Sequence, residues 1–242
     1  MGDERPPAIW LAEQRPRRPR LTAERIARAA VAVLDAEGAS GLSMRRLAAR
    51  LGVSAMSLYE YVNSKEDVLD LAVDEAFAEV ELAAADGVPW REALAQQLRQ
   101  GRDVMRRHPW LPAVMSTRAL LGPNSLALSE RFYAILTAAG LDGPRLTAVV
   151  GALTYYVQGY AAMENFWREV HRDPAREAEL RAAAQQYLES RRADYPTLAR
   201  QADLVGTDDF DESFELGLGT VLDGIEAQLR SGGGHRRRRP PR

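Results

Sequence analysis

The sequence has no cysteine and no long apolar run. The missing cysteines exclude a secreted scaffold held by disulfides and a thiolate metal site. The first 20 residues hold no apolar segment of signal-peptide length. The most apolar stretch, residues 146–163, carries threonine, glutamine and tyrosine and is shorter than the roughly 20 residues that cross a bilayer. We therefore expect a cytoplasmic protein that makes no contact with membranes.

Strand patterns and catalytic motifs are also missing. No run of β-branched residues alternates with polar ones over the length of a strand. There is no G-x-S-x-G elbow, no phosphate-binding P-loop and no histidine pair at metal-ligand spacing, the histidines being His108, His171 and His235. We expect an all-α protein that is not an enzyme and has no catalytic residue, no cofactor and no metal site.

Basic residues gather toward the two ends of the chain. The net charge is −2, yet Arg and Lys outnumber Asp and Glu by two in residues 1–20 and by five in residues 231–242. Acidic residues outnumber basic ones by ten in residues 67–230. We interpret residues 1–20 as a flexible basic arm and residues 231–242 as a disordered basic tail. Contact with phosphates and simple solvation both stay open for these two segments.

Helical patterns fill most of the chain between these ends. Thr22, Ser43 and Ser54 are residue types that cap helix N-termini, and each precedes apolar residues at helical spacing. We expect Gly38 to stop the first of these three helices and Gly52 to take a left-handed conformation after the second. Longer helices are expected over residues 64–84, 90–107, 124–139, 143–169, 174–191 and 209–230.

The second and third short helices are separated by a turn of three residues, 52–54, which is the layout of a helix-turn-helix. A generic three-helix bundle shares parts of this layout. The motifs GLSMRRLAARLGVS and LYEYV, with KEDVL at residues 65–69, make residues 21–69 resemble the DNA-binding head of the TetR family of transcriptional regulators. The later residues resemble the family's ligand-binding and dimerisation domain only in helical layout and size. We place the DNA-binding domain at residues 21–66 and the ligand-binding and dimerisation domain at residues 67–230.

The resemblance implies a set of DNA contacts. The residues are Arg45, Ser54, Ala55, Met56, Ser57, Tyr59, Tyr61 and Lys65. In the family, the positions of residues 55–57 read base edges, and those of Tyr59, Tyr61 and Lys65 grip the sugar-phosphate backbone. Residues 55–61 contain no Arg, Asn or Gln, the side chains that make bidentate base contacts. We therefore expect few direct hydrogen bonds to base edges, and sequence specificity that depends on Arg45, on apolar contacts and on DNA shape.

Two segments of the body are candidates for binding a ligand. Residues 146–168 form an aromatic-rich helical pattern with polar tips, which is typical of small-molecule pockets and also of a plain core. Residues 107–121 hold two prolines and are expected to be an irregular connection. The candidate ligand contacts in these segments are His108, Trp110, Met115, Thr117, Tyr155, Gln158, Tyr160, Met163 and Trp167.

The last helical pattern carries a broad apolar stripe, with Phe214, Leu218 and Leu222 at spacings of four. Gly217 and Gly219 would allow another helix to approach closely. By resemblance this helix pairs with the long helix in a homodimer interface, which would set two recognition helices roughly 34 Å apart on a palindromic operator. We expect a repressor that binds operator DNA and is released by a small apolar or aromatic effector. A regulator without a ligand, or an activator, remains the alternative.

Overall fold

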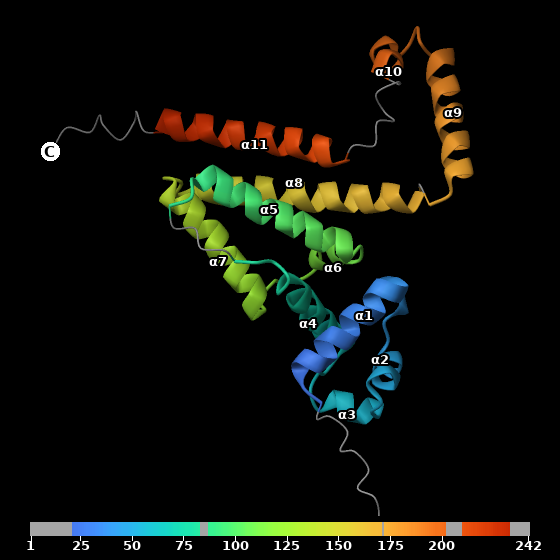
Figure 1. Ribbon diagram of the computed structural model, residues 1–242, viewed down its shortest axis with the longest axis vertical. Coiled ribbons are helices and arrows are strands. Elements are labelled where there is room, and N and C mark those ends of the chain that lie inside the picture. The colour runs from blue at the N-terminus through green and yellow to red at the C-terminus, as the bar shows by residue number, and fades with distance from the viewer. Residues whose placement is uncertain (1–20, 83–86, 171, 202–209, 233–242) are drawn as a thin grey trace, which may run out of the picture.

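The protein is built entirely from helices over the residues described by the computed structural model, which are 21–82, 87–170, 172–201 and 210–232. A small head of three helices lies at one end of the molecule, and the long helices of the body lie at the other (Figure 1). The helices are α1 (Ala23–Gly41), α2 (Met44–Leu51), α3 (Ala55–Tyr59), α4 (Lys65–Phe77), α5 (Trp90–Arg107), α6 (Leu111–Met115), α7 (Pro123–Ala138), α8 (Gly143–Val170), α9 (Pro174–Ser190), α10 (Pro196–Gln201) and α11 (Phe210–Gly232).

Local sequence signals set the helix ends in the head. The side chains of Thr22, Ser43 and Ser54 each accept a bond from a backbone N–H of the first turn that follows, as their residue types predict. Gly38 has a φ of 68° and interrupts helical geometry near the end of α1. Gly52 is left-handed, with φ 67° and ψ 31°, and its N–H bonds to carbonyl oxygens of α2. The predicted turn between α2 and α3 is confirmed.

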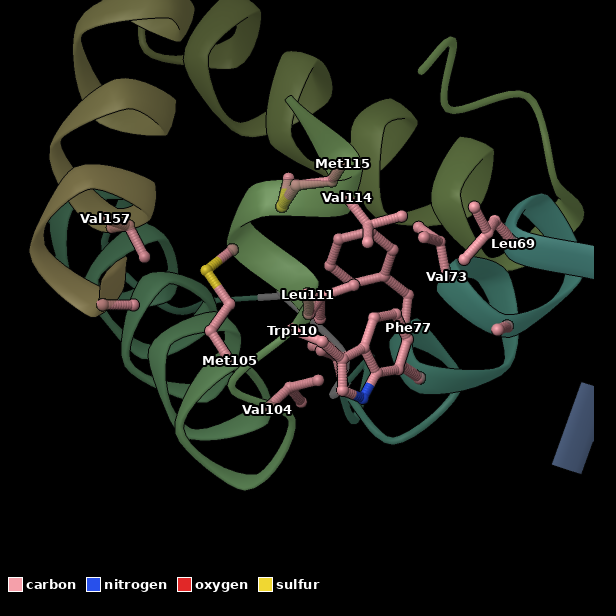
Figure 2. Packing of buried hydrophobic residues seen from close by; sticks show 14 of the residues in the cluster. Leu69, Val73, Phe77, Val104, Met105, Trp110, Leu111, Val114, Met115 and Val157 are labelled. Atoms are coloured by element: carbon pink, nitrogen blue, oxygen red, sulfur yellow. The ribbon is translucent and has the colours of Figure 1, made fainter. Parts of the chain in front are cut away.

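Helix α4 joins the head to the body without a break in the apolar core. Val68 and Leu69 lie in the same buried cluster as Ile26 and Leu58 of the head, and Phe77 at the other end of α4 packs with the body. Figure 2 shows Leu69, Val73 and Phe77 along α4, with Trp110, Leu111, Val114 and Met115 of the α6 region against them. The domain boundary predicted at residue 66 therefore does not coincide with a gap in packing.

A buried ion pair ties the body helices together. Glu164 of α8 is fully buried, and its Oε2 accepts a 2.9 Å bond from Nε of Arg102 on α5. Arg102 also bonds the carbonyl oxygen of Phe210 and stacks over the ring of Phe214, so the same guanidinium fixes the start of α11. Removing a charge from such a pair is costly because the remaining charge stays buried.

The apolar stripe of α11 packs inside the chain. Phe214, Leu218, Leu222 and Ile225 are buried, and α11 lies along α8 (Figure 1). A Cβ at Gly217 would come within 2.3 Å of the Tyr156 hydroxyl, which confirms the predicted close helix approach there. At Gly219 a Cβ would meet nothing within 4 Å in the single chain, so the close approach predicted there stays a prediction for the dimer.

Some helix boundaries differ from those predicted. Helix α4 ends at Phe77, not at residue 84, and the segment expected to be irregular contains α6, with proline in its first turn. Helix α10 was not predicted. The predicted basic arm and most of the predicted tail lie outside the described residues. Among the described residues, no helix combines the length and the apolar character needed to cross a bilayer.

Candidate DNA interface and ligand cavity

Helix α3 presents uncharged side chains at the surface, both apolar and hydroxyl-bearing. Within α3, only Leu58 is buried, and it anchors the helix to the core of the head. Met56 is 75% exposed and Tyr59 is 47% exposed, although neither side chain gains from contact with water. The Ser54 hydroxyl accepts from the N–H of Ser57, which keeps the first turn of α3 ordered at the surface. The sequence-predicted residues Ser54, Ala55, Met56 and Tyr59 are thus exposed, and Ser57 is partly exposed.

The basic side chains near α3 differ in how far they are already bonded within the protein. Arg46 is tied to Glu37 and donates a 2.7 Å bond to the carbonyl oxygen of Gly41 at the end of α1. Arg45 on the same helix is exposed. The Lys65 ammonium donates one bond, 3.0 Å, to the carbonyl oxygen of Ala39, and an ammonium has two further donors. The geometry is compatible with Arg45 and Lys65 as polyanion contacts, and Tyr61 is 45% exposed nearby in sequence.

The body contains an apolar cavity of about 150 Å³ between α5, α7 and α8, with α4 and α6 at its end. Its wall is made of residues that carry no ionisable carboxylate, guanidinium, ammonium or imidazole group. These residues are Phe77, Val80, Gln97, Leu98, Gly101, Met105, Met115, Leu120, Ser125, Leu128, Ser129, Phe132, Tyr133, Val150, Thr154 and Val157. Such a cavity suits an uncharged organic molecule.

Of the residues predicted to contact a ligand, Met115 lies in this wall. Thr117 lies in a different groove, of about 660 Å³, between the head and the body. Gln158 donates a 2.8 Å bond to the carbonyl oxygen of Pro112 and so fixes α6 to α8. The Tyr160 hydroxyl donates to the carbonyl oxygen of Phe210 and anchors α11. The structure therefore does not gather the predicted residues around one cavity.

Tyr155, Met163 and Trp167 lie on exposed parts of α8, with 75% of Tyr155 accessible to solvent. The cavity-facing residues of α8 are instead Val150, Thr154 and Val157, at helical spacings of four and three. The aromatic cluster is close in sequence, but a helix points neighbouring residues in different directions. The prediction treated these side chains as one group, whereas α8 distributes them between the core, α11 and the outer surface.

His108 and Trp110 connect the body to the head. Nδ1 of His108 lies 2.7 Å from Oδ1 of Asp35 on α1, and Nε2 lies 3.0 Å from Oε1 of Glu79. Trp110 donates a 2.7 Å bond from Nε1 to Asp35. These two predicted ligand residues therefore lie at the joint between head and body.

The surroundings of Glu79 favour its charged carboxylate. Burial alone raises the pKa of Glu79, but hydrogen bonds from His108 and Arg107 outweigh burial and hold that pKa below its ordinary value. Nε of Arg107 donates to Glu79 at 2.8 Å. Within the described ranges, no group of three or more His, Asp or Glu residues is arranged to hold a metal ion.

Sequence reasoning missed most of the cavity wall. The sequence predicted Gln97, Gly101 and Phe132 only as parts of helices. Gly101 lies in the middle of α5, whose other residues favour a helix, and glycine is unfavourable at such a position. A glycine inside a helix, with no turn to explain it, was the one sequence signal for the cavity wall. Gln97 gave no such signal, because the sequence does not distinguish it from its neighbour Gln96, which is exposed.

Models of two known domain families match this chain. The family described as "Bacterial regulatory proteins, tetR family" matches residues 26–72, and "Tetracyclin repressor-like, C-terminal domain" matches residues 82–229. Both matches together span the head and the body.

Individual proteins give the same result. An HTH-type transcriptional regulator of Saccharopolyspora erythraea is 42% identical over 224 residues, which is 92% of each chain. The HTH-type transcriptional repressor DrrR1 of Streptomyces coeruleorubidus is 38% identical, over 90% of this chain and 83% of its own. The solved structure of ActR from Streptomyces coelicolor in complex with actinorhodin has a TM-score of 0.75 and 31% identity, covering 87% of this chain and 99% of ActR.

Proposed function

The chain belongs to the TetR family of transcriptional regulators, and from this premise we propose that it is a ligand-responsive repressor. As a homodimer it binds a palindromic operator through α3, and a small molecule in the α5–α7–α8 cavity releases it. The observation that carries the proposal is the set of exposed, uncharged side chains of α3, in a helix-turn-helix whose two helices are both capped by serine. A surface of this kind fits the floor of a major groove, where methyl groups and base edges are read.

The outer face of the body supports the dimer. Tyr155, Met163 and Phe166 of α8 and Leu216 of α11 are large apolar side chains that are more than half exposed in the single chain. Covering these side chains with a second copy of the chain would remove them from water. The two-fold axis would then pass between α8 and α11 of the two subunits and place both heads on the same side of the dimer.

The connection between cavity and head supports the release mechanism. Met105 and Met115 line the cavity, and the segment between them holds His108 and Trp110, both bonded to Asp35 of α1. Figure 2 shows Met105 and Trp110 near the start of α6 and Met115 at its other end. A ligand that separates the two methionines shifts the α5–α6 corner and, through Asp35, the head. It acts as an effector only if it binds the released state more tightly than the operator-bound state.

The relatives support the same proposal. DrrR1, a transcriptional repressor, aligns with 90% of this chain. ActR was solved with actinorhodin bound and shares the arrangement of helices. Repression and small-molecule binding are properties of those proteins, and we carry them to this chain as part of the proposal.

The proposal is tested with the full-length protein and fluorescent duplexes that tile the DNA upstream of its own gene. Fluorescence anisotropy at two salt concentrations separates specific from purely electrostatic binding, because phosphate contacts alone weaken steeply with salt. We expect tight, salt-tolerant binding to one palindromic duplex, at two chains per duplex, and its release by a compound from an aromatic panel. Equal binding to all duplexes, abolished by salt, would contradict operator recognition.

A further inference from the structure

We propose that Arg118 is a positioning residue for operator binding, which holds the head in one orientation relative to the body by bonding to the start of α4. Arg118 lies in the connection between α6 and α7, outside the predicted DNA contacts. The inference rests on the proposed dimer and its palindromic operator. It goes further by naming a residue of the body that decides which spacing of the two half-sites is bound.

The guanidinium of Arg118 bonds to two points on α4. Its Nε donates to Oδ1 of Asp70, and its Nη2 donates to the backbone carbonyl oxygen of Glu66 in the first turn of the helix. The Arg118 side chain is 12% exposed, so little of it is open to solvent. A guanidinium holds its donors in a rigid planar fork, so two bonds to one helix fix a direction as well as a distance.

On its other side, Arg118 is attached to the body through α6. Its backbone N–H bonds to the carbonyl oxygen of Met115, the last residue of α6. Gln158 of α8 donates to the carbonyl oxygen of Pro112, which lies in the first turn of α6. The bonds of Arg118 therefore relate the position of α4 to that of α6 and α8.

The start of α4 belongs to the head in its packing. Helix α4 packs more extensively against α1 than against any helix of the body. Arg118, Glu66 and Asp70 line the groove of about 660 Å³ between the head and the body. Apolar packing does not fill this groove, and apolar contact has no direction of its own. The orientation of the head on this side therefore depends on the bonds of Arg118.

Arg118 supplies the second of two attachments on either side of α6. Before α6, His108 and Trp110 bond to Asp35 of α1. After α6, Arg118 bonds to α4. A single attachment leaves the head free to turn about that point, whereas attachments to two different helices of one unit prevent the turn.

The orientation of the heads decides which operators fit a dimer. One base pair added between the half-sites moves one of them by about 3.4 Å and turns it by about 34° around the duplex. A head held in one orientation cannot follow this change, and a head that turns freely can. Loss of the Arg118 bonds should therefore widen the range of spacings that are bound.

The test uses full-length protein and duplexes that carry the operator half-sites at the native spacing and at one and two base pairs more or less. Fluorescence anisotropy gives the affinity for each duplex. We expect the parent protein to lose about tenfold in affinity for a change of one base pair, since a displaced half-site costs at least as much as a mismatched pair. Arg118→Met, which keeps the length of the side chain and removes its donors, should lose about threefold or less.

Two further variants separate position from charge. Asp70→Ala changes the net charge in the opposite direction to Arg118→Met, and it should widen the tolerated spacings as well. Arg145→Met, at an exposed arginine near the start of α8, matches the charge change of Arg118→Met and should keep the preference of the parent. If Arg118→Met and Asp70→Ala shift the affinities for all duplexes in opposite directions with the spacing preference unchanged, Arg118 acts only through its charge and the inference is overturned.

A distance measurement needs neither an operator nor a dimer. The chain has no cysteine, so nitroxide labels attach only at Arg50→Cys on α2 and Ala127→Cys on α7, two exposed positions. Labelled chains are diluted with unlabelled ones, and electron–electron resonance records the distance between head and body within one chain. We expect a broader distribution in Arg118→Met than in the parent and no change in Arg145→Met.

The proposed function fails separately from this inference. If the parent binds every spacing equally, recognition of a palindrome by a dimer falls, and the distance measurement alone decides the role of Arg118. A distance distribution that is unchanged in Arg118→Met overturns that role, whatever the operator affinities show. Circular dichroism of each variant confirms that it is folded under the conditions of both measurements.

Discussion

Replacing Asp74 should destabilise the protein far more than replacing an exposed acid on the same helix. Asp74 lies on α4 and is 8% exposed. Its carboxylate accepts bonds from the backbone N–H and the hydroxyl of Ser125, at 2.9 and 3.0 Å, and from Nδ2 of Asn124 at 3.0 Å. Helix α7 begins after Gly122, which has no capping side chain. Asp74 therefore caps α7 from a different helix.

The magnitude follows from these contacts. Loss of a capping side chain costs about 0.5–2 kcal/mol, and a hydrogen bond to a charged group contributes about 1.5–3 kcal/mol. The bonds of one carboxylate are not additive, so we expect Asp74→Ala to lower the free energy of unfolding by about 3 kcal/mol. Asp74→Asn keeps one acceptor oxygen and should cost about half as much. The matched control is Asp70→Ala, since Asp70 lies one turn earlier and forms an exposed ion pair with Arg118, worth about 1 kcal/mol or less.

Urea denaturation followed by circular dichroism measures these differences. Protein concentration is held constant across the variants, because the proposed dimerisation would make stability depend on it. Unchanged slopes of free energy against urea would show that the variants unfold as the parent protein does. If Asp74→Ala and Asp70→Ala differ by less than about 1 kcal/mol, the capping role of Asp74 is refuted.

Other predictions concern the DNA face, the buried ion pair and one tyrosine. Tyr59→Ala should weaken binding to all duplexes, whereas Arg45→Ala should also relax base preference by about 1–3 kcal/mol, measured by anisotropy on single-base operator variants. Glu164→Leu should cost up to about 3 kcal/mol in urea, because the buried Arg102 then has the exposed Asp211 as its carboxylate partner, and adding Arg102→Met should recover part of that loss. Burial raises the pKa of Tyr156 to about 12, so the stability from its neutral phenol is complete below pH 10 and is lost as the pH rises through 12. Absorbance of phenolate at alkaline pH, compared with Tyr156→Phe, tests this.

Features that depend on a few adjacent residues were predictable from the sequence. A hydroxyl before a helix has its partner two or three residues away, which is why the caps at Thr22, Ser43 and Ser54 were correct. The left-handed Gly52 is equally local. The same locality made the head recognisable, and the family matches confirm it.

Features that depend on rotation about a helix axis, or on distant partners, were not predictable. The sequence shows that Tyr155 and Tyr160 share a helix, but the packing of α5 and α11 decides that Tyr160 bonds to Phe210 while Tyr155 faces outward. His108 meets Asp35, which is 73 positions earlier in the chain. No local sequence pattern predicts that two residues so far apart in the chain will be in contact. The roles assigned to individual DNA and ligand residues stay predictions.

The continuous core along α4 constrains how such regulators can be recombined. Val68 and Leu69 pack with the head, while Phe77 packs with the body, all within thirteen residues of one helix. A chimera cut just after α3 would pair the head of one protein with a foreign α4 and open voids on both sides of it. Exchange of operator specificity between relatives therefore requires α4 to travel with its own head, together with the side chains of α6 and α7 that receive its far end.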